Sequence, residues 1–434
     1  MVRPVTPTDK RGRPAAVGPG ERREGVIRRL SVLLVGVLMV AVAGGTASAD
    51  RSADPRFAPP KSYDNPGRGQ PQNVIKGDFD EDGVVDLAMS VGNAPNNAVS
   101  LFRGKRNGTF AEPPRRFDAA EDAAYVVKSD FNGDGHLDLA VSDFGAGRDA
   151  PGSVAVLFGT GEGTFKGRQS FPSGGKQPSG LAAPDVDGDG DEDLAVANGL
   201  SGSPNDLAGN VSVLLNNGAG AFKDGQSIEP PSPPSSRVAP VFLAAGDLDG
   251  DGDPDLVATV SIVTQAGGEA ANVLVLENEK GRYVRSQSVA VGTVPQGIVF
   301  GPFDGDRRPD FATANAESNN VSVGLGNGDG TFGKAREFPS GGIGPTSLLA
   351  RDLNKDGKKD LAVSNIGAGP GGGGNVGVLT GRGDGTFRKS KTFRAGNGPA
   401  GLTAGRFDRD GKPDLAVADV FSNKLSILMN TTPR

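Results

Sequence analysis

A motif of aspartates at alternate positions, followed by a glycine and a last aspartate, recurs seven times along this chain, with two of the copies incomplete. The phrase Asp-x-Asp-x-Asp-Gly-x-x-Asp is complete at Asp78–Asp86, and its copies follow at intervals of 50 to 62 residues. Their last aspartates are Asp86, Asp138, Asp193, Asp255, Asp310, Asp360 and Asp414. A hard cation such as Ca²⁺ takes six to eight oxygen ligands, and a glycine lets the chain turn sharply enough to wrap one ion. The spacing therefore predicts calcium loops.

Five of the seven loops keep the full pattern, with Asn in place of Asp at the second position of two of them. The predicted side-chain ligands are Asp78, Asp80, Asp82 and Asp86; Asp130, Asn132, Asp134 and Asp138; Asp185, Asp187, Asp189 and Asp193; Asp247, Asp249, Asp251 and Asp255; and Asp352, Asn354, Asp356 and Asp360. The last aspartate is expected to bind through both oxygens, and the residue after the glycine through its carbonyl. We predict about five Ca²⁺ ions.

Aspartate and asparagine also cap turns through their own side chains, without any ion. Against that alternative, each loop gathers three or four oxygen-bearing side chains, and unneutralised carboxylates repel one another. Mg²⁺ suits the pattern less well because it tends to keep its waters.

The fifth and seventh loops depart from the pattern. The fifth has Pro302 at the first ligand position and Arg307 where the glycine should be. The seventh begins with Arg406, ahead of Asp408, Asp410 and Asp414. Both are interpreted as degenerate. In the seventh we expect the planar Arg406 guanidinium, with its several donors, to stand in for the ion.

Short strands must carry these loops, since 68 glycines and 32 prolines in 434 residues argue against long helices. After each loop comes an apolar run such as Leu139–Val141, then an alternating run such as Val321–Leu325. A glycine turn such as Asn327–Phe332 leads to a fourth strand. Seven repeats of four antiparallel strands predict an all-β, seven-bladed β-propeller.

The chain ends favour the propeller over an open solenoid or a string of sandwiches. The seventh repeat stops at Leu428–Asn430, before its fourth strand, whereas Phe57 and Tyr63 show the aromatic spacing of a fourth strand ahead of the first loop. We therefore expect the N-terminal segment to supply the missing outer strand and close the ring.

The loops, the Asp-Leu-Ala-Val runs and the Gly-Asp-Gly-Thr-Phe turn at 383–387 resemble the FG-GAP/VCBS repeats known from the propeller of integrin α subunits. The resemblance spans residues 55 to 430. It implies calcium between the first two strands of a blade, where the ion stiffens the blade. The Phe-Gly-Gly-Ala-Pro signature of the family is degenerate, and its nearest trace begins at Phe144.

The first 49 residues are typical of a signal peptide, with a basic stretch, an apolar run from Val32 to Ala43, and Ala47-Ser48-Ala49 before the expected cleavage. A retained membrane anchor is the alternative, and the paired arginines leave general secretion and twin-arginine export open. Residues 50–434 then form the secreted propeller. The leader carries eight Lys/Arg and three Asp/Glu, so its removal shifts the net charge from −6 to −11. That charge argues against nucleic acid as a partner.

No catalytic constellation stands apart from the metal loops. The only histidine, His136, lies inside the second loop, and the chain has no cysteine nucleophile. We therefore expect a non-catalytic, monomeric scaffold for adhesion or for an extracellular protein or glycan ligand. The alternatives are a lectin, which the absence of Trp and the presence of only three Tyr make the second choice, and a calcium-assisted polysaccharide lyase or hydrolase.

The partner surface is expected on the face opposite the metal loops, because binding residues concentrate on long connections. The connections predicted there are Gly145–Gly152, Gly199–Asn210, Glu229–Pro240, Ala266–Ala271 and Gly367–Gly374.

Overall fold

The computed structural model describes residues 54–67, 69–93, 98–145, 150–200, 208–232, 236–264 and 269–433. The predicted signal peptide, residues 1–49, lies outside this part of the chain. Among the described residues, no helix is both long and apolar enough to cross a membrane.

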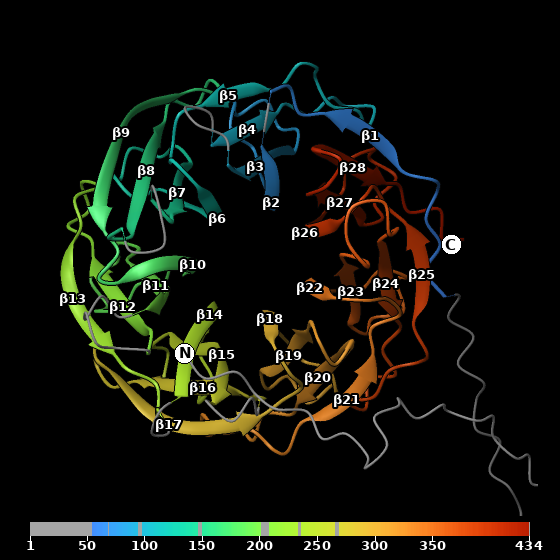
Figure 1. Ribbon diagram of the computed structural model, residues 1–434. Helices are drawn as coiled ribbons and strands as arrows, with labels where there is room; N and C mark the ends of the chain where they lie inside the picture. Colours follow the sequence, from blue (N-terminus) through green and yellow to red (C-terminus); the bar gives the residue numbers. More distant parts are fainter. Residues whose placement is uncertain are drawn as a thin grey trace, which may run out of the picture. The chain divides into compact units, whose positions relative to one another are not determined.

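Seven four-stranded antiparallel sheets stand around a central channel, with the first strand of each blade innermost (Figure 1). Blades 1 to 4 comprise β2 Gln70–Gly77, β3 Asp86–Gly92, β4 Val99–Phe102 and β5 Arg115–Phe117; β6 Ala123–Ser129, β7 Asp138–Asp143, β8 Ser153–Gly159 and β9 Phe165–Pro172; β10 Lys176–Ala182, β11 Leu194–Leu200, β12 Asn210–Leu215 and β13 Lys223–Ile228; and β14 Ser236–Gly246, β15 Asp255–Thr264, β16 Glu269–Asn278 and β17 Tyr283–Ala290.

Blades 5 and 6 repeat the same order, and blade 7 takes its outer strand from the start of the chain. Their strands are β18 Pro295–Gly301, β19 Asp310–Asn315, β20 Asn320–Gly324 and β21 Arg336–Pro339; β22 Pro345–Arg351, β23 Asp360–Asn365, β24 Asn375–Leu379 and β25 Lys391–Arg394; and β26 Pro399–Gly405, β27 Asp414–Asp419, β28 Lys424–Leu428 and β1 Lys61–Asp64. The predicted all-β, seven-bladed propeller is confirmed.

Ring closure through the N-terminal strand is also confirmed. β1 pairs antiparallel with β28, with Tyr63 opposite Leu425, and a further bridge joins Phe57 to Asn430. The Tyr63 ring is fully buried and meets Phe110 of blade 1 edge to face, with centroids 5.6 Å apart. β1 therefore completes blade 7 and also contacts blade 1.

The core lies between blades. Strand two of each blade is almost entirely buried, because both of its faces meet a neighbouring sheet. This explains why those strands read Asp-Leu-Ala-Val, with small alanines between larger residues, and do not alternate apolar with polar.

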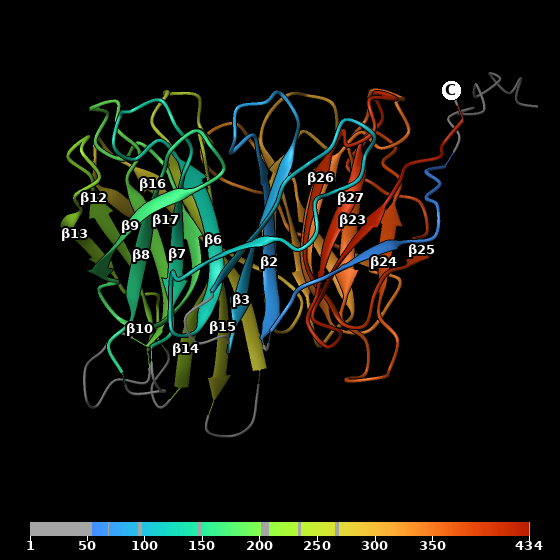
Figure 2. The ribbon, with the colours of Figure 1, turned by 90° about the horizontal axis from the view of Figure 1, so that it is seen from above.

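Two of the predicted connections on the face opposite the metal loops are partly strand, which corrects the sequence interpretation. β14 already begins at Ser236, within Glu229–Pro240, and β16 begins at Glu269, within Ala266–Ala271. Val238 pairs with Ile262 and is fully buried, so apolar residues extend this blade. β14 and β15 extend beyond their neighbours at one end of the ring (Figure 2). Gly367–Gly374 connects β23 to β24 as expected, whereas parts of Gly145–Gly152 and Gly199–Asn210 lie outside the described residues.

The last residue of β27, Asp419, is a fully buried carboxylate at a position where blades 3, 5 and 6 have Asn198, Asn315 and Asn365. Its Oδ2 accepts a hydrogen bond from Ser426 (2.6 Å). Burial raises the pKa of Asp419 to about 7, an effect that the bonds from Ser426 and Gly396 and the charge of Lys424 only partly offset.

We predict that Asp419→Asn stabilises the protein above pH 7. The folded chain holds the proton of Asp419 more tightly than the unfolded chain, whose pKa is near 3.8. The cost of ionising Asp419 is therefore absent below about pH 4, grows as the pH rises, and is complete above 7, on the order of a few kcal/mol. In the variant, the amide can donate to Ser426, as Asn198 donates to Ser212 (2.9 Å) and Asn315 to Ser322 (2.9 Å).

Urea unfolding at pH 4 and pH 8 measures this effect. The reverse substitution at the equivalent position of blade 6, Asn365→Asp, is expected to lose stability at pH 8 only. An Asp419→Asn protein that gains nothing between the two pH values would contradict the assignment.

Candidate metal centres

Each aspartate-rich loop joins strand one to strand two of a blade, and all seven loops share one backbone path. Two residues in every loop adopt a left-handed conformation, three and five positions after the first ligand position. They are Glu81 and Gly83, Gly133 and Gly135, Gly188 and Gly190, Gly250 and Gly252, Gly305 and Arg307, Lys355 and Gly357, and Arg409 and Gly411. Arg307 reaches a φ of 72° in the place of a glycine, which is costly for a side-chain-bearing residue. The left-handed backbone path of the loop therefore does not require glycine at every such position.

The closing aspartates carry a structural role that the sequence did not reveal. All seven are buried. In each, Oδ2 accepts the backbone N–H of the apolar residue that follows the first ligand position, and Oδ1 accepts an N–H from the end of strand three, at 2.6 to 3.0 Å. The carboxylate therefore ties the two turns of a blade together. The signal was present in the sequence, because this aspartate persists even in the two degenerate loops.

Burial raises the pKa of these closing carboxyls. Together with the charge of the neighbouring loop carboxylates, and against the backbone hydrogen bonds that lower it, burial brings the pKa to about 6 for Asp86 and about 7 for Asp360. A cation bound in the loop would offset both causes, since it supplies the opposite charge that a buried carboxylate lacks.

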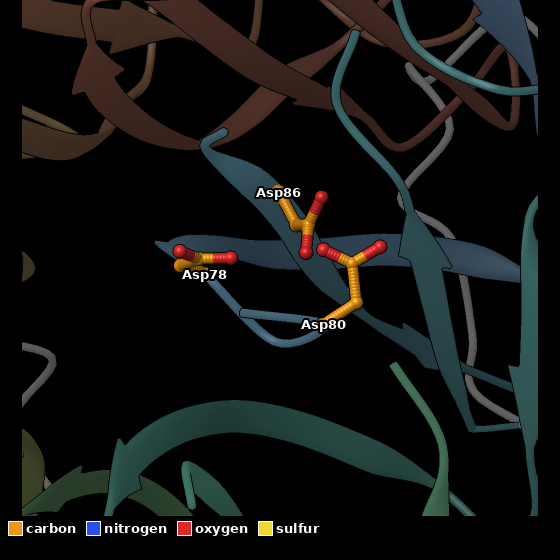
Figure 3. Close-up of side chains that lie close together, drawn as sticks. All are labelled: Asp78, Asp80 and Asp86. Atoms are coloured by element: carbon orange, nitrogen blue, oxygen red, sulfur yellow. The ribbon is translucent and has the colours of Figure 1, made fainter. Parts of the chain in front are cut away.

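Four loops bring carboxylate oxygens from three residues within 4.8 Å of one another. The triads are Asp78, Asp80 and Asp86; Asp185, Asp187 and Asp193; Asp247, Asp249 and Asp251; and Asp304, Asp306 and Asp310. In the first triad the three side chains point toward a common centre (Figure 3). Asp78 Oδ1 and Asp80 Oδ1 are buried there without a hydrogen-bond partner among the described residues. Hard oxygen donors in this arrangement fit a divalent cation.

The other predicted ligands of these loops lie nearby but are directed by the loop backbone. Oδ1 of Asp82 accepts from the Val84 N–H (2.8 Å), and Oδ1 of Asp189 accepts from the Asp191 N–H (3.0 Å). In the fourth loop it is Asp255, the closing residue, that stands outside the triad.

The second and sixth loops hold asparagine amides, and within the described part of the chain they form no carboxylate triad. Asn132 Nδ2 donates to Asp134 (3.2 Å), and Asn354 Nδ2 donates to Asp356 (3.1 Å). The first ligands, Asp130 and Asp352, accept N–H bonds from the loop glycines at 2.7 and 2.9 Å, and the closing residues, Asp138 and Asp360, make the bonds described above. For these loops, metal binding stays a prediction.

Two interpretations of the degenerate loops need correction. The fifth loop gathers its three aspartates despite Pro302 and Arg307, because Arg307 follows the left-handed path of the glycine that it replaces. In the seventh loop the expected role of Arg406 is wrong. Its side chain is exposed, and the ion pair with Asp410 comes from Lys412, at 3.0 Å.

Neighbouring basic groups also reach the loops. Arg103, just after β4, pairs with Asp80 of the first triad. His136 Nδ1 lies 2.5 Å from Glu81, and this contact links the loops of blades 1 and 2.

The metal loops also join each blade to the next. In each loop, one apolar residue donates its N–H to the closing aspartate. In six of the loops the carbonyl of that same residue accepts a hydrogen bond from the following blade, at the turn between strands three and four. The pairs are Gly163 to Phe79, Asn216 to Phe131, Asn278 to Val186, Gly330 to Leu248, Gly385 to Phe303 and Asn430 to Leu353, at 2.8 to 3.4 Å. Metal loops and glycine turns therefore share one face, as the strand order predicts.

Aromatic contacts strengthen the same boundary, the seam between neighbouring blades. The loop phenylalanine meets the phenylalanine of the next blade's turn edge to face, as in Phe79 with Phe165 (6.0 Å), Phe303 with Phe387 (5.6 Å) and Phe407 with Phe110 (5.5 Å). The seam between blades 7 and 1 is thus packed like the others.

Five segments of the chain match the FG-GAP-like repeat, and together they cover more than half of its length. They are residues 78–141, 130–196, 185–258, 303–363 and 366–417. The chain belongs to the FG-GAP-like repeat family. The first FG-GAP-like match runs from Asp78 to Val141, that is, from one metal loop through the next and into the strand that follows it.

Solved structures share the propeller fold at low identity. A putative 6-phosphogluconolactonase from Bacteroides fragilis is 15% identical, with a TM-score of 0.57 over 81% of this chain and 94% of that one. A putative 6-phosphogluconolactonase from Bacteroides uniformis is 14% identical, with a TM-score of 0.54 over 83% and 95%. At such identity the likeness concerns the fold alone. Among curated proteins, none shows significant similarity to this FG-GAP-like chain.

We predict that Phe387→Ala lowers the free energy of unfolding by about 3 to 5 kcal/mol, because it opens a cavity in the seam between blades 5 and 6. The Phe387 side chain is 4% exposed and contacts both Phe303 and Phe338. The control is Ile343→Ala, which removes apolar atoms from a 58% exposed residue and should change stability by no more than about 0.5 kcal/mol. Equal losses in the two variants would show that the seam is not a major source of stability.

Proposed function

We propose that this FG-GAP-like protein is an exported, non-catalytic ligand-binding scaffold whose blades are stiffened by Ca²⁺. The observation that carries the proposal is the first metal loop, where three carboxylates converge and two of their buried oxygens lack a partner among the described residues. An unpaired buried carboxylate oxygen is costly, and a calcium ion is the ligand that its chemistry favours.

The position of the loops explains how an ion would stiffen the ring. Each loop carries the closing aspartate of its own blade, and six of the seven also accept a bond from the next blade. Repulsion among the loop carboxylates therefore acts on the seam between blades. A bound ion removes that repulsion and fixes the loop path, so binding energy is converted into stability of the ring.

The ligand is proposed to bind at the opposite face. On the metal face the closing carboxylates and the loop carbonyls are already engaged in the framework, and the other loop carboxylates are assigned to the ion. The opposite face carries the connection Gly367–Gly374, the extended β14 and β15, and a cavity at the mouth of the central channel. These features leave polar groups available to a partner.

The chemistry of the loops supports a non-catalytic role. His136 contacts Glu81 within the metal-loop face, and the closing carboxylates serve the framework. The two Bacteroides propellers are named as putative lactonases, but nothing beyond their fold is transferred to this chain.

Calcium is predicted to raise the melting temperature of the protein, and a chelator should lower it reversibly. Mg²⁺ at equal concentration should have a much smaller effect because it dehydrates reluctantly. Differential scanning calorimetry with Ca²⁺, with Mg²⁺ and with chelator measures this. If Ca²⁺, Mg²⁺ and chelator all leave the melting temperature unchanged, calcium stiffening is refuted, even if ligand binding persists.

Single-loop variants are predicted to change the number of bound calcium ions. Asp187→Ala and Asp306→Ala each remove a member of a triad, so each should lower the Ca²⁺ count by one. Asp408→Ala should leave the count unchanged, since Arg406 replaces the first ligand of its loop and, among the described residues, Asp408, Asp410 and Asp414 form no triad. Metal analysis after equilibrium dialysis gives the count, with the exposed Asp224→Ala of β13 as control. An unchanged count in Asp306→Ala would restore the view that the fifth loop is degenerate.

A further inference from the structure

The innermost strands enclose a cavity of about 460 Å³ in the central channel. Its lining comes from the first strand of every blade and includes Gln72 of β2, Tyr125 of β6, Phe242 of β14, Gln296 of β18 and Ser347 of β22. These residues precede the ends of their strands, where the metal loops begin, so the cavity lies toward the face opposite the loops. Its volume falls in the range of small-molecule sites.

We propose that this cavity binds a neutral, polyhydroxylated ligand, namely an uncharged sugar or the end of an uncharged glycan. The inference rests on the ligand-binding role proposed above and deepens it by naming the site and the ligand class. It is carried by the chemistry of the lining.

Two amides without internal partners line the cavity. The Gln72 and Gln296 side chains make no hydrogen bond within the described part of the chain. Asn73 lies beside them but is only 6% exposed, and its side chain is hydrogen-bonded to Tyr125. By contrast, the Ser179 and Thr346 hydroxyls are used between blades, bonding Val241 O (2.8 Å) and Ala400 O (3.0 Å). Amides, which both donate and accept, suit the hydroxyls of a sugar.

An aromatic wall stands beside these amides. The Tyr125 and Phe242 rings lie edge to face, with centroids 5.4 Å apart. Gly180 of β10 permits the close approach of the inner strands here, because a Cβ at that position would lie 2.7 Å from Val241 O. Rings next to hydrogen-bonding amides match the two kinds of surface that a sugar presents, C–H faces and hydroxyl edges.

The charge of the lining selects a neutral ligand over an anionic one. Among the described residues around the cavity there is no Lys, Arg or His, and Asp122 is the one charged side chain. Its Oδ1 accepts the Asn93 N–H at 2.9 Å. A phosphate, sulfate or uronate would meet this carboxylate without a counter-cation, which disfavours anions.

The test begins with the calcium-loaded protein on an array of immobilised neutral, sulfated and uronate-containing glycans. Calorimetry with the free neutral oligosaccharides of the same series then separates a free sugar from a chain end. Neutral glycans are expected to bind, and Gln72→Ala and Gln296→Ala should each weaken binding about fivefold to tenfold. Tyr125→Phe, which keeps the ring, should retain most of the affinity. The exposed Gln169→Ala of β9 is the matched control and should bind like the unmodified protein.

Melting curves of each variant confirm that the ring is intact. Neutral-glycan binding that survives both glutamine variants would place the site elsewhere and overturn this inference, while the scaffold proposal stands. Binding confined to anionic glycans, or to none, also overturns it. Calcium stiffening is judged separately by the melting temperature, so failure here is distinguishable from failure of the proposed function.

Discussion

The closing aspartate of each loop is the interaction on which the rest of the ring depends. One oxygen holds the start of the metal loop and the other holds the end of strand three, so a single buried side chain fixes both turns at that face of a blade. Because the same loop residue offers its carbonyl to the next blade, this geometry also fixes the blade-to-blade seam. No disulfide can brace the ring, since the chain contains no cysteine, so these buried hydrogen bonds and the apolar contacts between blades are its main protein-borne constraints.

Features that depend only on residues within one repeat could be predicted from the sequence. The aspartate-rich loops between strands one and two, the strand order and the closure by Phe57 to Tyr63 all follow from spacing within a repeat that recurs seven times, so each copy supports the others. What the sequence did not reveal depends on residues one blade away. The bond from the Gly385 N–H to the Phe303 carbonyl, for example, follows from how a loop packs against the neighbouring turn. Within the seventh loop, spacing alone also did not reveal that Lys412, and not Arg406, pairs with Asp410.

Position is a second limit of the sequence. The chain has no Trp and only three Tyr, and this count made a lectin the second choice. A count says nothing about position, and one of those tyrosines lies at the channel mouth beside Phe242, although the two are 117 positions apart in the printed sequence. The extension of blade 4 was missed for a related reason: its added strand residues, such as Val238 paired with Ile262, have no counterpart in the other blades and so carry no repeat signal.

The degenerate loops indicate which function of the motif is primary. The seventh loop has lost its first ligand, yet Asp414 keeps both backbone bonds and Phe407 keeps its place in the seam. The left-handed path also survives, with Arg409 at a φ of 66°. If the loop existed only to bind an ion, nothing would hold this path once a ligand was lost. The closing aspartate therefore builds the blade first, and the proposed metal site is an addition whose ligands an individual blade can lose while the ring stays closed.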